Sequence, residues 1–211
     1  LGRVRPAHVV AAMLVLGIIA LAGPSWRREL PPFVEDKAPL MIALDVSASM
    51  GGTDVAPSRL ERAKQKIRDL LAARAGARTG LIAYAGSAHL VMPLPDAGAV
   101  IEPFLMALTP GLMPVQGKRA LTALTLATQA LATEAVGGTI LLVADDIVGA
   151  DRDSVQQAAG RNSVVILRVM PAGAAGQTDA GLRSDAVDVT VDAADIHALE
   201  SRIETRYQAA Q

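Results

Sequence analysis

The stretch LMIALDVSASM, residues 40–50, places an apolar run of strand length directly before an aspartate and two serines. Residues two apart in an extended chain point to the same side, so Asp45, Ser47 and Ser49 converge if the chain stays extended past the strand. Three oxygen-bearing side chains would then face one point. Such oxygen ligands suit a hard divalent cation, Mg²⁺ or Mn²⁺, and no soft ligand favours zinc.

The rest of the chain alternates strand-like and helix-like segments. Ser58 and Glu61 form an S-x-x-E capping box before an amphipathic helix that Gly76 would end. Further helices are expected at 119–131, near 153–159 and over 196–207, and further strands in TGLIAYAGSAHLVMPL (two strands joined at Gly86-Ser87), GTILLVAD, SVVILRVM and AVDVTV. Apolar strands alternating with helices predict an α/β fold, a doubly wound and mainly parallel sheet covered on both faces.

A second predicted strand, TILLVAD, also ends in a carboxylate, Asp145. In open α/β sheets, ligands bind beyond the carboxyl ends of the strands, where the strand order reverses. If these two strands flank that reversal, Asp45 and Asp145 face each other across the crevice. The sequence therefore predicts a metal site formed by Asp45, Ser47, Ser49 and Asp145.

The N-terminal part has the composition of a membrane span. Residues 7–23, AHVVAAMLVLGIIALAG, contain no Asp, Glu, Lys or Arg, and with Pro24 to Trp26 they reach about 20 residues, enough to cross a bilayer. A core helix would show a polar face, and a signal peptide would begin at Met, so we expect a membrane span. Because the sequence begins at Leu1 and not at Met, we also expect it to be a fragment of a longer protein. The predicted parts are a transmembrane helix with its flanks (1–28), a linker (29–38) and one globular domain (39–211).

Overall composition excludes several classes of function. With 20 basic and 21 acidic residues the net charge is -1, so the chain lacks the basic field that binds nucleic acid. The chain has no cysteine, which excludes disulfides and thiolate metal sites. Aromatic residues make up 2% of the chain, too few for stacking platforms.

Catalytic motifs are weak. Ser87 and His89 are two residues apart, but no G-x-S-x-G elbow or third orienting group accompanies them. The two glycine-rich phosphate-binding motifs, G-x-x-x-x-G-K-[ST] and G-x-G-x-x-G, are both absent from the sequence. A metal-assisted phosphatase at Asp45 and Asp145 would need a further base, and Asp146 is the one candidate. We therefore expect no enzyme.

DVSAS at residues 45–49 resembles the D-x-S-x-S signature of von Willebrand factor A (VWA) domains, which forms their metal-ion-dependent adhesion site (MIDAS). LLVAD at 141–145 resembles the later strand of that family, with its second acidic residue. The order of GPSW, DVSASM, PSRLERAKQKIRDLL, GLIAYAGSAHLVMPL and LLVADD is similar to that of membrane-anchored bacterial proteins of the Bat type, the BatB group more than the BatA group. The resemblance extends from Ala7 onward.

The resemblance implies a binding module. Such sites hold a metal with one open coordination position, which captures an acidic group of a protein partner. Bat-type proteins are associated with MoxR-type AAA+ ATPases and other Bat proteins in envelope stress tolerance. The resemblance also implies an inner-membrane location, with the domain on the periplasmic face and further spans outside this sequence.

One position departs from the family pattern. Where the family has Thr or Ser, Lys118 stands here, and at about 4 Å its ammonium would repel a divalent metal by several kcal/mol. Lys118 either turns outward or places its ammonium near Asp45 and Asp145, which weakens or replaces the metal and leaves a vestigial scaffold. Thr122 is a possible substitute hydroxyl, and a shifted alignment with a solvated Lys118 is the alternative.

Two further aspartates have open roles. Asp54 either braces the metal loop or shapes the turn before the capping box. Asp146 either supports the metal through a water or is a plain turn residue after the strand.

Overall fold

The computed structural model describes residues 10, 13–15, 37–94, 100–134, 137–147, 152–170, 186–187, 198–201 and 203–205. The chain divides into two compact units, Leu1–Glu35 and Asp36–Gln211. In the first unit, residues 10 and 13–15 are helical and exposed. No helix among the described residues is long and apolar enough to cross a membrane. Most of the predicted span, residues 7–23, and residues 29–36 of the predicted linker lie outside the described part.

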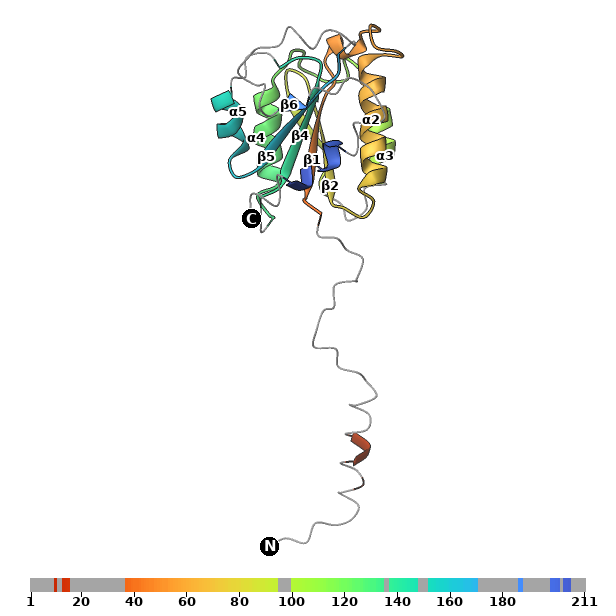
Figure 1. The fold of residues 1–211 in the computed structure, drawn as a ribbon, viewed down its shortest axis with the longest axis vertical. Coiled ribbons are helices and arrows are strands. Elements are labelled where there is room, and N and C mark those ends of the chain that lie inside the picture. Colours follow the sequence, from red (N-terminus) through yellow and green to blue (C-terminus); the bar gives the residue numbers. More distant parts are fainter. Residues whose placement is uncertain are drawn as a thin grey trace. The chain divides into compact units, whose positions relative to one another are not determined.

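The second unit contains a twisted sheet with helices on both faces (Figure 1). Its strand order is β3-β2-β1-β4-β5-β6, and every neighbouring pair is parallel except β2 and β3. The strands are β1 (Leu40–Asp45), β2 (Thr79–Tyr84), β3 (Ala88–Met92), β4 (Thr139–Ala144), β5 (Ser163–Arg168) and β6 (Ala186–Val187). The predicted doubly wound α/β fold is confirmed.

The strands β1, β2 and β4 are buried throughout, because helices cover both faces of the sheet. Helices α2 (Arg59–Ala73) and α3 (Ile101–Ala107) lie on one face, and α4 (Ala120–Ala130) and α5 (Arg152–Ala159) on the other (Figure 1). Alternate residues of β1 enter two separate cores, Leu40, Ile42 and Leu44 on the α2 side and Met41 and Ala43 on the α4 side. The predicted helices at 119–131 and 153–159 are thus found within a residue of their expected ends.

One half of the predicted capping box is present at the start of α2. Ser58 is the N-cap, and its hydroxyl accepts a hydrogen bond from the Glu61 backbone N–H at 3.2 Å. The Glu61 carboxylate pairs with Lys64 Nζ at 2.8 Å. Gly76 follows the helix with φ +83°, the left-handed conformation that glycine adopts without steric cost. The cap therefore fixes where α2 begins, directly after the loop that follows β1.

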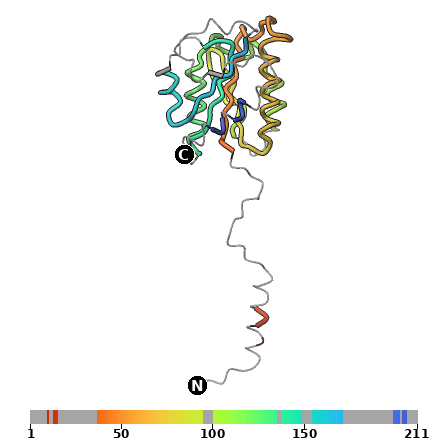
Figure 2. Tube along the Cα trace, in the orientation of Figure 1, coloured from red at the N-terminus to blue at the C-terminus, as the bar shows by residue number. Residues whose placement is uncertain are grey.

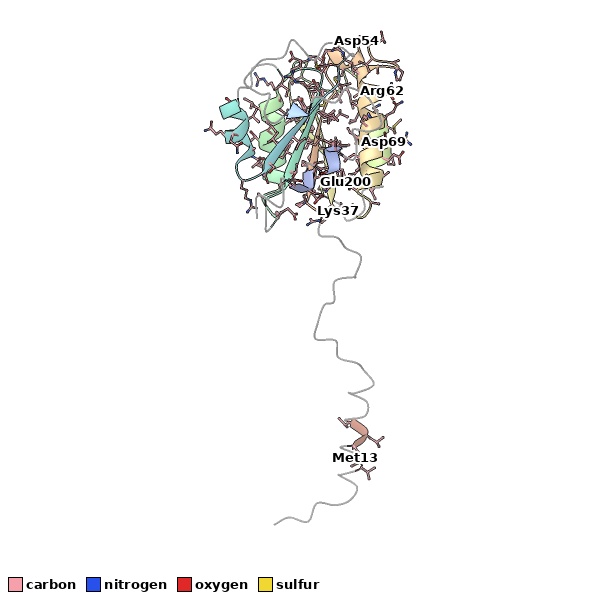
Figure 3. All side chains as sticks on the ribbon, viewed as in Figure 1. Met13, Lys37, Asp54, Arg62, Asp69 and Glu200 are labelled. Atoms are coloured by element: carbon pink, nitrogen blue, oxygen red, sulfur yellow. The ribbon has the colours of Figure 1, made fainter. Side chains whose placement is uncertain are left out.

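At the end of the sheet where the parallel strands begin, charged residues join the start of the domain to its last helix. Lys37 Nζ lies 3.2 Å from Glu200 Oε1 and donates to the Ala73 carbonyl. Residues 198–201 and 203–205 are helical, with Leu199 and Ile203 buried in the α2-side core. Figure 2 traces this last segment beside the start of β1, and Figure 3 shows Lys37 and Glu200 at the end of the domain opposite Asp54.

Candidate functional site

The site lies where the strand order reverses. From β1 the sheet continues to β2 and β3 on one side and to β4, β5 and β6 on the other. Asp45 is the last residue of β1, and Asp145 directly follows β4, its parallel neighbour. Crevices beyond the carboxyl ends of strands at such a reversal are where open α/β sheets bind ligands. The two carboxylates that we predicted to face each other therefore end adjacent strands.

Asp45, Ser47 and Ser49 come together, although the chain stays extended only as far as Ser47. It turns into a short 3₁₀ helix, η1 (Ala48–Gly51), in which the Met50 N–H donates to the Ser47 carbonyl. The turn still brings the two hydroxyl oxygens within 3.1 Å of each other. Asp45 Oδ1 accepts the Ser47 backbone N–H at 2.7 Å, whereas Asp45 Oδ2 is buried without a hydrogen-bond partner. This unsatisfied oxygen is free to accept a cation or a donor.

Asp145 is held by two cationic side chains. Lys118 Nζ lies 2.5 Å from Asp145 Oδ1, and Arg59 Nη1 lies 2.6 Å from Asp145 Oδ2. The Asp146 backbone N–H also donates to Oδ1, at 2.8 Å. The Asp145 side chain is only 3% exposed. Of the two orientations that we considered for Lys118, the structure therefore has the inward one.

The loop before α4 sets the position of Lys118. The Gly86 N–H donates to the Val115 carbonyl, and the Arg119 N–H donates to the Ala85 carbonyl at 2.7 Å. The loops approach so closely that a Cβ on Gly86 would lie 2.2 Å from the Gln116 carbonyl oxygen. These contacts fix the backbone on both sides of Lys118, so its side chain starts from a defined position beside Asp145.

Arg59 is a site residue that the sequence reading missed. Its guanidinium binds Asp54 through two hydrogen bonds, of 2.8 and 2.7 Å, while its third nitrogen binds Asp145. Asp54 thus holds Arg59 against Asp145, and its carboxylate also accepts backbone N–H groups of Asp54 and Val55, which is the turn-shaping role considered for it. Arg59 is the first residue of α2, and a cation at a helix N-terminus is unfavourable unless a carboxylate compensates it. The positive charge of Arg59 at the start of a helix was therefore the feature of the sequence that could have indicated a carboxylate partner.

The electrostatics of the two carboxylates differ. Burial raises the pKa of Asp45 above its usual range, and the nearby Asp145 charge adds to this. Burial would also raise the pKa of Asp145, but hydrogen bonds from Lys118, Ser49 and Arg59, together with the charge of Lys118, outweigh it, so the pKa is lowered. Tyr84, paired with Asp45 in the sheet, has a strongly raised pKa because it is buried beside both carboxylates. Asp145 is thus the better stabilised anion of the two.

Other predicted residues lie apart from this cluster or have local roles. Thr122 is exposed on α4, whose buried positions include Ala120 and Ala123, so it is not brought into the site. Asp146 is exposed, and its carboxylate accepts the Ile147 N–H at 2.8 Å, as a turn residue would. Ser87 and His89 are hydrogen-bonded at 3.1 Å at the start of the edge strand β3, where His89 is exposed.

The residues present only partly fit a divalent metal. Asp45 Oδ2 and the paired hydroxyls of Ser47 and Ser49 are suitable hard donors. Asp145 is not a suitable metal ligand, because each of its oxygens already accepts a hydrogen bond from a cationic side chain. A divalent ion 4 Å from the Lys118 ammonium would be repelled by about 8 kcal/mol at an effective dielectric of about 20. Within the described residues, no three His, Cys, Asp or Glu side chains gather in a way that could hold a metal. As a set, the residues do not fit the metal.

Comparison with known proteins identifies the fold family. The family model of the von Willebrand factor type A domain matches residues 40–148, slightly more than half of the chain. The matched part begins with β1 and ends just after Asp145, so it contains the whole cluster described above. The chain therefore belongs to the von Willebrand factor type A family.

Solved structures similar to this chain include two proteins from Bacteroides species. BatB from Bacteroides thetaiotaomicron is 28% identical, with a TM-score of 0.57 over 81% of this chain and 87% of that one. An aerotolerance-related membrane protein from Bacteroides fragilis is 25% identical, with a TM-score of 0.61 over 82% of this chain and 99% of that one. A von Willebrand factor type A protein from Catenulispora acidiphila, 18% identical with a TM-score of 0.50 over 63% of this chain and 33% of that one, shares the fold.

A curated relative, a UPF0353 protein of Mycobacterium avium, is 43% identical over 94 residues. The match covers 43% of this chain and 26% of that protein. The chain thus spans about a quarter of the length of the curated relatives that it matches.

Proposed function

We propose that this chain is a non-catalytic protein-interaction module that binds a protein partner at the carboxyl edge of its sheet. In the proposal, the predicted N-terminal span anchors it in a bacterial inner membrane, with the domain in the periplasm. There it works in a Bat-type complex, associated with a MoxR-type AAA+ ATPase and other Bat proteins in envelope stress tolerance. The family membership and the likeness to BatB support this assignment.

The observation that carries the proposal is the convergence of three segments at one edge. The end of β1, the loop between α3 and α4, and the end of β4 meet there, since the Gly111 N–H donates to the Val46 carbonyl and Lys118 binds Asp145. On that loop, Leu112 is 56% exposed and Val115 is 52% exposed. Exposed apolar side chains bordered by polar and charged residues are typical of surfaces that bind proteins. The partner surface is therefore proposed on this loop.

The enzyme alternative has little support in the geometry. A phosphatase using Asp45 and Asp145 needs a free nucleophile or base beside a metal. Asp145 is neutralised by Lys118 and Arg59, and Asp146 accepts a local backbone hydrogen bond. Hydrolysis of a generic phosphate ester by the purified chain, lost in Asp45→Ala, would favour this alternative over the interaction module.

A second candidate mode is the metal-dependent capture that the family resemblance implies. A Mg²⁺ or Mn²⁺ ion held by Asp45, Ser47, Ser49 and Asp145 would present an open position to a partner's carboxylate. The unpartnered Asp45 Oδ2 beside two hydroxyls favours this mode. The cations on Asp145 oppose it, so we rank it second.

Binding of purified partners tests the proposal. The chain is immobilised in detergent and titrated with the MoxR-type ATPase and the Bat proteins of its source organism, with Mg²⁺ and with a chelator. The double variant Leu112→Ser/Val115→Ser should weaken binding at least about tenfold, which corresponds to 1.4 kcal/mol. Leu90→Ser is the matched control, because Leu90 is 43% exposed on the edge strand β3. Equal losses in both variants, or no binding to any of these proteins, would contradict the proposal.

The membrane anchor is tested separately. Membranes from cells expressing the chain are washed with alkaline carbonate, and the chain should stay in the pellet. A variant that lacks residues 1–28 should be released. Release of both forms would remove the anchor from the proposal without affecting the binding surface.

A further inference from the structure

Lys118 lies where the resemblance implies a hydroxyl ligand of the metal, and its ammonium contacts one of the expected ligands. Its Nζ is 2.5 Å from Asp145 Oδ1. The ammonium therefore occupies an oxygen of Asp145 that the metal would need.

The remaining positions around Asp145 are also filled. Oδ2 accepts Arg59 Nη1 at 2.6 Å, and Oδ1 accepts the Asp146 N–H at 2.8 Å in addition to Lys118. Arg59 cannot easily turn away, because Asp54 holds its other nitrogens at 2.7 and 2.8 Å. Three of the roughly four lone-pair sites of the Asp145 carboxylate are thus already occupied, two of them by cationic side chains that a metal ion would have to displace.

The charges of the cluster lead to the same conclusion. Asp45, Asp54 and Asp145 carry three negative charges, and Arg59 and Lys118 carry two positive ones, so one negative charge remains. A divalent ion would overcompensate it. With a neutral residue in place of Lys118, two negative charges would remain, which a divalent ion neutralises. The charge of Lys118 therefore sets whether the site accepts a metal.

We propose that Lys118 is a built-in replacement for the metal ion, so that the carboxyl edge of this domain is held together without a divalent cation. The ammonium ties the loop before α4 to the end of β4, and Arg59 ties α2 to the same carboxylate. Partner recognition at this edge is then independent of metal. The inference about the site itself does not depend on which partner binds, or on whether one binds.

Metal titration of the full chain tests this inference. Mg²⁺ and Mn²⁺ are titrated calorimetrically into the wild-type chain and into Lys118→Thr, and thermal unfolding is followed with Mg²⁺ and with chelator. The wild type should give no saturable heat and the same Tm in both conditions. Lys118→Thr should bind Mg²⁺ saturably, at least about tenfold more tightly than the weakest binding that the titration could have detected for the wild type, and its Tm should fall with chelator and recover with Mg²⁺.

Two further variants make each outcome decisive. Lys118→Ser also supplies a hydroxyl and replaces Lys118→Thr if that variant fails to fold. Adding Asp45→Asn to the hydroxyl variant should abolish the gained binding. Saturable binding to the wild type that Asp45→Asn removes would overturn the inference, as would a lack of binding in both hydroxyl variants. Either result leaves the proposed interaction function open, because that function is tested by partner binding at Leu112 and Val115.

Discussion

The guanidinium of Arg74 lies 2.5 Å from the carboxylate of Glu204, 130 residues later in the chain. Its second Nη donates to the Ala38 carbonyl, just before β1. The Arg74 side chain is completely buried, whereas that of Glu204 is 26% exposed. One buried cation therefore joins the end of α2, the last helix and the segment that leads into the central strand.

Replacing Arg74 with Met should destabilise the domain strongly. The variant leaves Glu204 and the Ala38 carbonyl without their buried donor, and removing one partner of a buried pair costs about 3–5 kcal/mol. Arg68→Ala is the matched control, because the Arg68–Glu102 pair is about half exposed on both sides. The control should change the free energy of unfolding by less than about 0.5 kcal/mol. Urea unfolding measures both, and equal effects would show that Arg74 has no special role.

The Lys118–Asp145 pair should show strong coupling. In a double-mutant cycle with Lys118→Met and Asp145→Asn, measured by urea unfolding in chelator, we expect a coupling free energy of about 1–3 kcal/mol. Each single variant leaves one charge without its partner at 2.5 Å, and the double variant removes both charges. Additivity within about 0.3 kcal/mol would mean that the contact contributes nothing to stability.

Gly86→Ala should disturb the loop that carries Lys118. The new Cβ would lie 2.2 Å from the Gln116 carbonyl oxygen, so one of the two loops must move, at a cost of about 1–3 kcal/mol. Gly51→Ala is the control, because its Cβ would meet Pro110 at an ordinary 3.5 Å. Thermal unfolding ranks the two variants. A Gly86→Ala chain as stable as Gly51→Ala would contradict the close approach of the loops.

Ser58→Ala should destabilise α2 by about 1 kcal/mol, because the Glu61 N–H loses its cap. Ser58→Asp should retain most of the stability, since aspartate is an equally good N-cap. Urea unfolding of the three chains provides the measurement. A loss in Ser58→Asp as large as in Ser58→Ala would indicate that the hydroxyl has another role.

Much of the fold follows from local sequence patterns. The five apolar strand residues before Asp45, the cap at Ser58 and the Gly86-Ser87 turn each determine a local element, and those elements appear where they were expected. The alternation of buried strands with helices then leaves a parallel sheet as the arrangement that covers every apolar face. The proximity of Asp45 and Asp145 could be predicted from the sequence, because neighbouring parallel strands have their carboxyl ends at the same end of the sheet.

The rest of the site depends on contacts between long side chains and residues far away in the sequence. Arg59 reaches Asp145 over 86 positions, and no local pattern encodes such a contact. The orientation of Lys118 depends on where the close contact between Gly86 and Gln116 places the loop. The three side chains were expected to converge on condition that the chain stayed extended; they come together in a turn instead, because the Ser47 carbonyl accepts the Met50 N–H. A residue count along the strand could not reveal that hydrogen bond.

The central position of β1 also has a mechanical consequence. Its residues pair in parallel register with β2 on one side and β4 on the other, from Leu40 onward. A force that pulls on the chain at Lys37 would act along β1 and shear both rows of hydrogen bonds at once, so that many bonds share the force. The domain is therefore expected to resist pulling at this end far better than pulling that peels the edge strand β3 away from β2 one bond at a time.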